Sequence, residues 1–209
     1  MSTIFLRSNL NYIKNTIKDS QQVYVIEPVP VLFKKISESS LSDLPSCKFF
    51  DNTIDIEEGQ ADFYISDKTP ELSSLYNFSR EVYRAVPKRK DWYFNRKCIV
   101  EKVRLDTFIS EQGIENVDHL HVHGCQGNNL NVLKSLGDKI DIVQTGICKG
   151  DWLASIYDSE NHALTIVSFL LEKGFAVKIH SNKTKVMTTG PNGSQKGLEA
   201  TIHFERKIV

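Results

Sequence analysis

The chain has 209 residues, of which 40% are hydrophobic, so it is long enough to bury one core of ordinary domain size. Its 26 basic and 26 acidic residues balance, which excludes a global field that would attract nucleic acid or an anionic membrane surface. No apolar run reaches the ~18 residues that a membrane-spanning helix needs. The N-terminus lacks the apolar region of a secretion signal, so we expect a soluble, cytoplasmic protein.

Strand-like and helical patterns alternate along the chain, which is typical of a parallel sheet with helices on both faces. Strands are predicted at 2–6, 22–26, 47–50, 61–65, 97–103, 118–123, 140–147, 175–180 and 199–205. Apolar periodicity predicts helices at 10–19, 30–37, 104–112, 128–136 and 161–173. The last two strands are joined by a turn-rich segment without helical periodicity, so we expect an antiparallel pair there. The predicted fold class is α/β, with a mostly parallel, doubly wound sheet.

The cysteines indicate neither a disulfide framework nor a cysteine-based metal site. They stand singly along the chain, without a paired CxxC spacing, as Cys47, Cys98, Cys125 and Cys148. This distribution is typical of a protein that works in a reducing compartment.

Residues 66–96 contain no clear strand and include two prolines and the aromatic segment DWYF. Long irregular segments in compact domains are usually functional or disordered, so we interpret this stretch as a lid or substrate-binding loop. It would belong to a single domain that spans residues 1–209. Tyr76, Trp92 and Tyr93 are candidate substrate-binding residues, because aromatic rings stack on sugars, although such rings also serve as ordinary core residues.

Residues 23–36, VYVIEPVPVLFKKI, run from a hydrophobic strand through Glu27 and Pro28 into a helix. A carboxylate at the carboxyl end of the second strand of a doubly wound sheet lies at the ligand crevice. There it can accept hydrogen bonds from both hydroxyls of an adenosine ribose. Glu27 can instead cap the following helix, whose positive end favours acids. The spacing alone leaves both interpretations open.

Several segments, in this order, resemble the FkbM-type S-adenosylmethionine-dependent methyltransferases. IEPVPVLFKKI (26–36) is similar to that family's strand-Glu-Pro-x-Pro segment, and FFDNTIDIEEGQADFYIS (49–66) is similar to its third and following strands. Residues 100–136 resemble its Leu-Asp helix, fourth strand and Gln-Gly turn, so the likeness covers most of residues 4–178. The resemblance implies a Rossmann-like methyltransferase fold with a sheet of about seven strands.

The first loop departs from the family pattern. The family carries Gly-Ala-Asn-x-Gly after the first strand, whereas this chain has FLRSNLNY (5–12), in which Arg7 and Asn11 replace the glycines. Asn11 tolerates a left-handed backbone, but Arg7 is hard to accommodate at such a position. Its guanidinium is instead suited to bind a carboxylate. The resemblance implies a cofactor site formed by Arg7, Ser8, Asn9, Asn11, Glu27, Pro28, Asp51, Asn52 and Gln126.

The fourth predicted strand ends in HLHVHGCQG (119–127), where the family usually has an acid before the Gln-Gly turn. His121 and His123 project to one side of the strand and are candidate catalytic bases, since imidazole titrates near neutral pH. They are alternatively buried, hydrogen-bonded core residues. A metal site is a third interpretation, but residues four apart on a strand lie roughly 13 Å from each other. Only a His121/His123 pair with Asp51 or Asp106 could then share an ion.

The residues and the resemblance together suggest an S-adenosylmethionine-dependent O-methyltransferase. The expected cofactor is S-adenosylmethionine, and the expected acceptor is a sugar hydroxyl of a glycan or glycoconjugate, with no nucleic-acid partner. The lost glycines and acids leave an alternative: a non-catalytic module of the same fold that binds glycans or acts as a scaffold.

Overall fold

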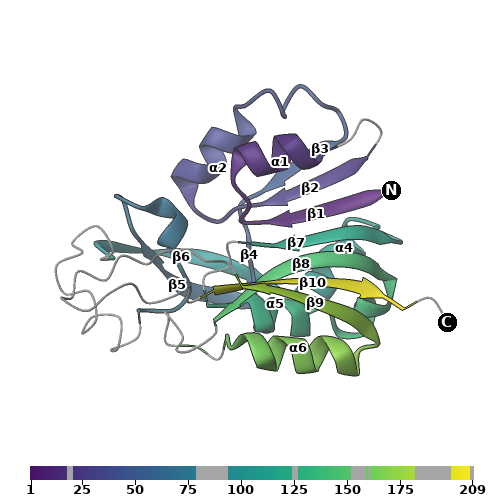
Figure 1. The fold of residues 1–209 in the computed structure, drawn as a ribbon. Helices are drawn as coiled ribbons and strands as arrows, with labels where there is room; N and C mark the ends of the chain where they lie inside the picture. The colour runs from purple at the N-terminus through teal and green to yellow at the C-terminus, as the bar shows by residue number, and fades with distance from the viewer. Residues whose placement is uncertain are drawn as a thin grey trace.

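The computed structural model describes residues 1–17, 21–78, 94–123, 127–151, 159, 161–181 and 199–207. A seven-stranded sheet with the order β3-β2-β1-β7-β8-β10-β9 forms its centre (Figure 1). Its strands are β1 (Ser2–Leu6), β2 (Gln22–Ile26), β3 (Cys47–Phe50), β7 (Val117–Val122), β8 (Val143–Asp151), β9 (Phe175–Ser181) and β10 (Glu199–Arg206). Only β10 runs against its neighbours in this sheet. The predicted mostly parallel sheet with an antiparallel closing pair is confirmed.

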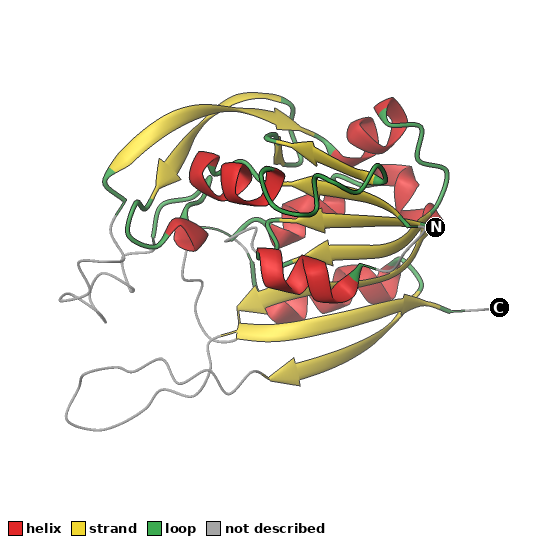
Figure 2. Ribbon diagram, turned by 90° about the horizontal axis from the view of Figure 1, so that it is seen from above, coloured by secondary structure: helices red, strands yellow, loops and turns green. Residues whose placement is uncertain are grey.

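Helices cover both faces of the sheet, as Figures 1 and 2 show. Helices α1 (Leu10–Thr16) and α2 (Pro30–Ser37) bury Ile13 and Ile36 against one face of β1 and β2. The other face carries the larger core, formed with α4 (Leu105–Glu111), α5 (Asn129–Lys134) and α6 (Ala163–Glu172). Within the described residues, no helix is both long and apolar enough to cross a membrane.

The central strands are apolar on both faces because both faces are covered. In β1, Ile4 and Leu6 join the larger core, whereas Phe5 points to the α1 and α2 side. By contrast, β10 alternates: Ile202 and Phe204 are buried in the larger core, while His203 points to the opposite, more polar face. This alternation sets which histidines of the neighbouring strands share a surface.

Two predicted strands lie in a second, smaller sheet. It contains β4 (Thr53–Ile54), β5 (Gly59–Ile65) and β6 (Arg96–Val103) in the order β4-β6-β5. Phe63 and Ile65 of β5 pack with Val29 and Leu32 at the start of α2, which anchors this sheet beside the carboxyl ends of β1 and β2 (Figure 1). A short 3-10 helix, η1 (Pro70–Leu72), follows β5.

The predicted strand at 140–147 is shifted in the structure. A 3-10 helix, η3 (Gly137–Ile142), precedes β8, whose pairing with β7 begins at Val143 opposite Val117. The strand continues to Asp151 because Gly150 and Asp151 pair with β10. The apolar residues from 140 onward predicted an earlier start for this strand, but pairing with β7 and β10 decides where β8 begins and ends.

Gly146 on β8 provides a test of this packing. A Cβ added there would lie 2.2 Å from Cζ of Phe204 and 2.7 Å from the carbonyl oxygen of Leu120. Gly146→Ala should therefore lower the free energy of unfolding by about 1–3 kcal/mol, the usual cost of overpacking. Urea denaturation measures this loss. Adding Phe204→Leu relieves the contact with the ring but not that with the Leu120 carbonyl, so the two losses should be less than additive. Strictly additive losses would contradict the assigned contact between Gly146 and Phe204.

Candidate functional site

Three strands bring polar residues to one edge of the main sheet. Because β1 is parallel to β2 and β7, Leu6 pairs with Ile26 on one side and with Val122 on the other. The residues that directly follow these strands are Arg7, Glu27 and His123. Glu27 and His123 therefore lie at one edge of the sheet, just beyond the carboxyl ends of β2 and β7. This edge also faces the small sheet.

Glu27 is buried, with only 2% of its surface exposed. One carboxylate oxygen accepts a 2.9 Å hydrogen bond from the amide of Val29, at the start of α2. The same oxygen lies 3.6 Å from Nε of Arg7. Burial raises the pKa of Glu27 above its ordinary value, and the charge of Arg7 and the Val29 amide offset only part of this rise. The carboxylate thus bonds the residue just before α2, and Glu27 lines a polar cavity.

Arg7 is the only non-glycine residue with a positive φ among those the structure describes, at +53°. The expected cost of a left-handed arginine applies here, and several contacts hold the side chain in place. Its guanidinium donates to the carbonyls of Ser73 and of Glu71, the latter at 3.3 Å, and lies 5.7 Å from the ring centre of Phe63. Asn11, the other replaced glycine, is an exposed residue of α1.

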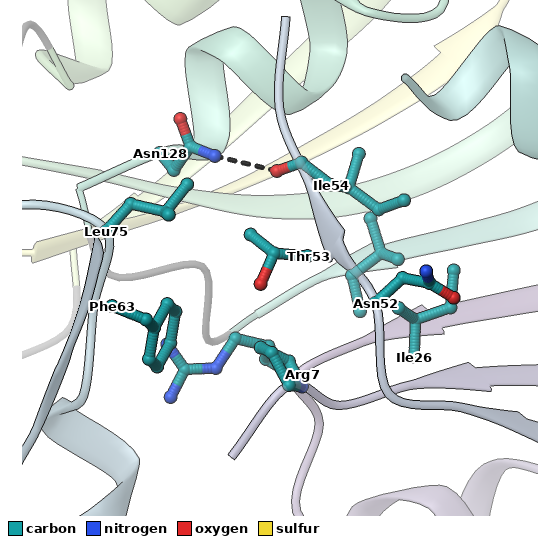
Figure 3. A pocket seen from close by; sticks show the side chains of 10 residues that line it. Arg7, Ile26, Asn52, Thr53, Ile54, Phe63, Leu75 and Asn128 are labelled. Carbon is teal, nitrogen blue, oxygen red and sulfur yellow. Dashed lines mark hydrogen bonds between the residues drawn. The ribbon is translucent and has the colours of Figure 1, made fainter. Parts of the chain in front are cut away.

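Two cavities have Arg7 in common among the residues that line them. The first is mostly apolar and has a volume of about 20 Å³ (Figure 3). It is lined by Leu6, Arg7, Ile26, Pro28, Asn52, Thr53, Ile54, Phe63, Leu75 and Asn128. The second is more polar, with a volume of about 190 Å³. It is lined by Arg7, Ser8, Asn9, Leu10, Glu27, Leu32, Lys35, Ile36, Glu71, His123 and Lys149.

Buried polar atoms without a hydrogen-bond partner gather around these cavities. Arg7 Nε, Ser8 Oγ and His123 Nε2 belong to residues of the polar cavity, and Thr53 Oγ1 belongs to the apolar one. Because buried polar groups in native proteins are nearly always hydrogen-bonded to protein or ordered water, these atoms are available to bond a water molecule or a polar ligand.

The two candidate bases have different surroundings. His123 lines the polar cavity together with Glu27, and its ring centre lies 4.4 Å from that of Tyr12. His121 stacks on Phe5, bonds Tyr12 through Nδ1 at 3.0 Å, and lines a separate cavity on the open sheet face. Burial lowers the pKa of His121 to about 3 and, together with the charge of Lys149, that of His123 to about 4.

The other predicted site residues are distributed over several places. Ser8 and Asn9 line the polar cavity, and the Asn9 side chain also caps α1 by accepting a 2.8 Å bond from the Tyr12 amide. Pro28 and Asn52 line the apolar cavity, whereas Asp51 is exposed and lines neither cavity. Gln126, Trp92 and Tyr93 lie outside the described residues.

Tyr76 lies beside Gly127 in a further cavity of about 220 Å³. Its hydroxyl accepts a 2.8 Å bond from Asn131 and is 3.4 Å from the side-chain oxygen of Asn128, a residue of the apolar cavity. Gly127 has φ +84°, a conformation that favours glycine and so explains this residue at the turn after β7. Desolvation raises the pKa of the Tyr76 hydroxyl.

The metal hypothesis gains no support from the described residues. Within them, no group of three or more histidine, cysteine, aspartate or glutamate side chains is arranged to hold an ion. Asp106, one of the proposed partners, lies on α4 and is bonded to Arg104 at 2.6 Å. Asp51 is exposed and does not line the histidine cavities.

Sequence reasoning missed Phe63 and Lys149. Lys149 lies two residues after the predicted strand 140–147, within β8, and could have been found as a charged residue near a strand end. Phe63 carries no local signal, because it reaches the site only through packing of the small sheet against α2.

The strand order, the single antiparallel strand and the acid after β2 define a Rossmann-like methyltransferase fold. A family profile described as the methyltransferase FkbM domain matches residues 6–177, most of the chain. The chain therefore belongs to the FkbM methyltransferase family, and the resemblance seen in the sequence is confirmed. A search of curated proteins finds no match.

The buried histidines should make stability depend on pH. The pKa of His121 falls from its ordinary 6.5 to about 3 in the folded chain, so between these values the unfolded state binds more protons. Stability is therefore full above pH 6.5 and falls as the pH drops, by about 2 kcal/mol for His121 between pH 7 and pH 5. Urea denaturation at both pH values measures this difference.

His121→Phe should reduce the pH dependence, because a phenyl ring has no proton to bind. His162→Gln, at an exposed position, serves as the control and should keep the wild-type dependence. Equal slopes for wild type and His121→Phe would contradict the burial of a neutral imidazole.

Proposed function

We propose that the chain is an S-adenosylmethionine-dependent O-methyltransferase whose acceptor is a sugar hydroxyl of a glycan or glycoconjugate. The observation that carries the proposal is the buried carboxylate of Glu27, which lines the polar cavity, while the neighbouring Pro28 lines the apolar one. The unpartnered buried atoms Ser8 Oγ and His123 Nε2 lie on the polar side. Membership of the FkbM methyltransferase family supports the reaction type.

The cavity residues match the chemical parts of an adenosyl cofactor. Glu27 can accept hydrogen bonds from the ribose hydroxyls, because carboxylates accept only. Ile26, Pro28 and Phe63 offer apolar contacts for a purine. Ser8 and Asn9 would bind the polar tail, with Lys149 as the cation for its carboxylate. When bound, the cofactor supplies an electrophilic methyl group on a sulfonium.

His123 is our proposed base in preference to His121. It lines the same cavity as Glu27, whereas His121 lines the separate cavity on the sheet face, and the buried Nε2 of each ring has no hydrogen-bond partner. A pKa of about 4 keeps the imidazole neutral near pH 7, so it can accept the hydroxyl proton of an acceptor. As a base this weak has little driving force, its main contribution would be to orient the acceptor.

Tyr76 is our proposed contact for the acceptor. Its cavity beside Gly127 also contains Asn131 and Ser159, whose amide and hydroxyl groups suit a hydroxyl-rich ligand. The proposal extends to Trp92 and Tyr93, whose rings could stack on a sugar.

The Glu27 assignment predicts a loss of cofactor binding in Glu27→Gln. This change keeps the side-chain shape but removes the charge that strengthens hydrogen bonds from the ribose. S-adenosylhomocysteine should bind about 10- to 100-fold more weakly, as expected for a charge-assisted bond. Isothermal titration calorimetry measures the affinity, and Glu38→Gln, on an exposed glutamate, is the control. Equal binding by wild type and Glu27→Gln would refute the assignment.

The assignment of His123 predicts that His123→Ala lowers kcat by about 100-fold, the order of loss expected when an acceptor hydroxyl is no longer oriented. Affinity for S-adenosylhomocysteine should change much less. His121→Ala should retain most of the activity, because that imidazole lies in the separate sheet-face cavity. Radiolabelled methyl transfer to a panel of sugars gives the rates. A larger loss in His121→Ala than in His123→Ala would reverse the assignment.

A non-catalytic module is the second candidate function, and the small volume of the apolar cavity favours it. At about 20 Å³ this cavity has room for roughly one water molecule rather than a purine. Thermal unfolding with S-adenosylhomocysteine separates the two candidates, since a ligand that binds the native state must raise the apparent melting temperature.

A further inference from the structure

Arg7 separates two spaces that one elongated ligand would have to occupy together. It lines both the apolar and the polar cavity, and of the consecutive residues Glu27 and Pro28 the first lines only the polar cavity and the second only the apolar one. Figure 3 shows the Arg7 side chain running along the apolar cavity, with its guanidinium beside Phe63. In this state the cleft is divided into two parts.

The contacts of Arg7 connect the main sheet to the segment that covers the cleft. The guanidinium bonds the carbonyls of Ser73 and Glu71, which belong to η1 and its C-terminal end. Leu75, two residues further on, forms part of the wall of the apolar cavity. Arg7 thus holds residues 71–75 close to the ends of β1 and β2.

The Arg7 side chain also lies against the Glu27 carboxylate, to which the ribose hydroxyls would bond. Arg7 and Glu27 have side chains only 7% and 3% exposed, and Nε lies 3.6 Å from the carboxylate oxygen. This nitrogen is itself buried without a hydrogen-bond partner, so the pair is held by charge and not by a formed hydrogen bond. Because no hydrogen bond has to be broken between them, Glu27 can exchange Arg7 for the ribose hydroxyls.

We propose that Arg7 is a latch: its side chain closes the cofactor cleft and must leave Glu27 and the 71–75 segment before an adenosyl ligand can enter. The inference rests on the proposed function, because it concerns the same cleft. Release of Arg7 would join the two cavities, expose the Glu27 carboxylate and free the segment that carries Leu75. The left-handed backbone at Arg7 directs the side chain into the cleft.

The latch makes the apparent affinity lower than the intrinsic one. Only open molecules can bind, so the apparent dissociation constant is the intrinsic one divided by the open fraction. If about one molecule in ten or fewer is open, removing the latch strengthens binding by at least about tenfold. Arg7→Gly removes the side chain and suits the positive φ, and Arg7→Gln is a second variant that keeps a side chain without charge.

Arg206 offers a matched control at the opposite edge of the sheet. It donates to the carbonyls of Ile140 and Lys173, lies 4.3 Å from the ring centre of Phe175 and pairs with Asp141 at 3.4 Å. Arg206→Gly therefore removes a comparable set of contacts without touching the cleft. Far-UV circular dichroism and thermal unfolding should establish that each variant is folded.

The test is calorimetric titration of wild type and the three variants with S-adenosylhomocysteine, followed by stopped-flow measurement of association. Both Arg7 variants should bind at least about tenfold more tightly and associate faster than wild type, whereas Arg206→Gly should bind like wild type. Weaker binding by the Arg7 variants would make Arg7 a ligand contact, and equal binding would make it a bystander. Either result overturns the latch and leaves the proposed function standing. No binding by wild type or by either folded Arg7 variant would overturn the proposed function as well.

Discussion

The parallel pairing of β1 with β2 and β7 is the constraint on which the site depends. Parallel strands end at the same edge of a sheet, so the residues that follow them meet although they are distant in sequence. Arg7, Glu27 and His123 are brought together in this way. The pairing holds because β1 is buried on both faces, with Ile4 and Leu6 in one core and Phe5 in the other.

The small sheet turns this edge into an enclosed cleft. Phe63 and Ile65 pack on Val29 and Leu32, so the sheet is fixed to the beginning of α2, directly after Glu27. The carboxylate is thereby desolvated, which raises its pKa and makes each remaining partner more important. The packing of the small sheet thus affects the charged residue: because it excludes water from Glu27, leaving that carboxylate without a partner would cost free energy.

Arg7 offsets part of the free-energy cost of burying the Glu27 carboxylate. Its positive charge lies beside Glu27, and its outer nitrogens bond backbone carbonyls near η1. A left-handed arginine is unfavourable by roughly 1–2 kcal/mol, so its contacts must outweigh this strain. Strained backbone of this kind is concentrated at functional sites, where the surrounding structure holds one conformation in place. Arg7, which stands where the family has a glycine, therefore takes part in the structure of the cleft.

The sequence by itself determined the order of strands and helices, because apolar periodicity reflects which face of each element is buried. It also singled out Glu27, His121 and His123 as candidates for the site, because they are titratable residues at or near strand ends. It could not separate His121 from His123, whose surroundings differ because of Phe5, Tyr12 and Lys149 on other strands and helices.

Only the tertiary structure decided that β5 and β6 form a separate sheet, that Phe63 enters the cleft, and that Arg7 reaches Ser73. These contacts join residues far apart in the chain, and their formation depends on packing that no local pattern encodes.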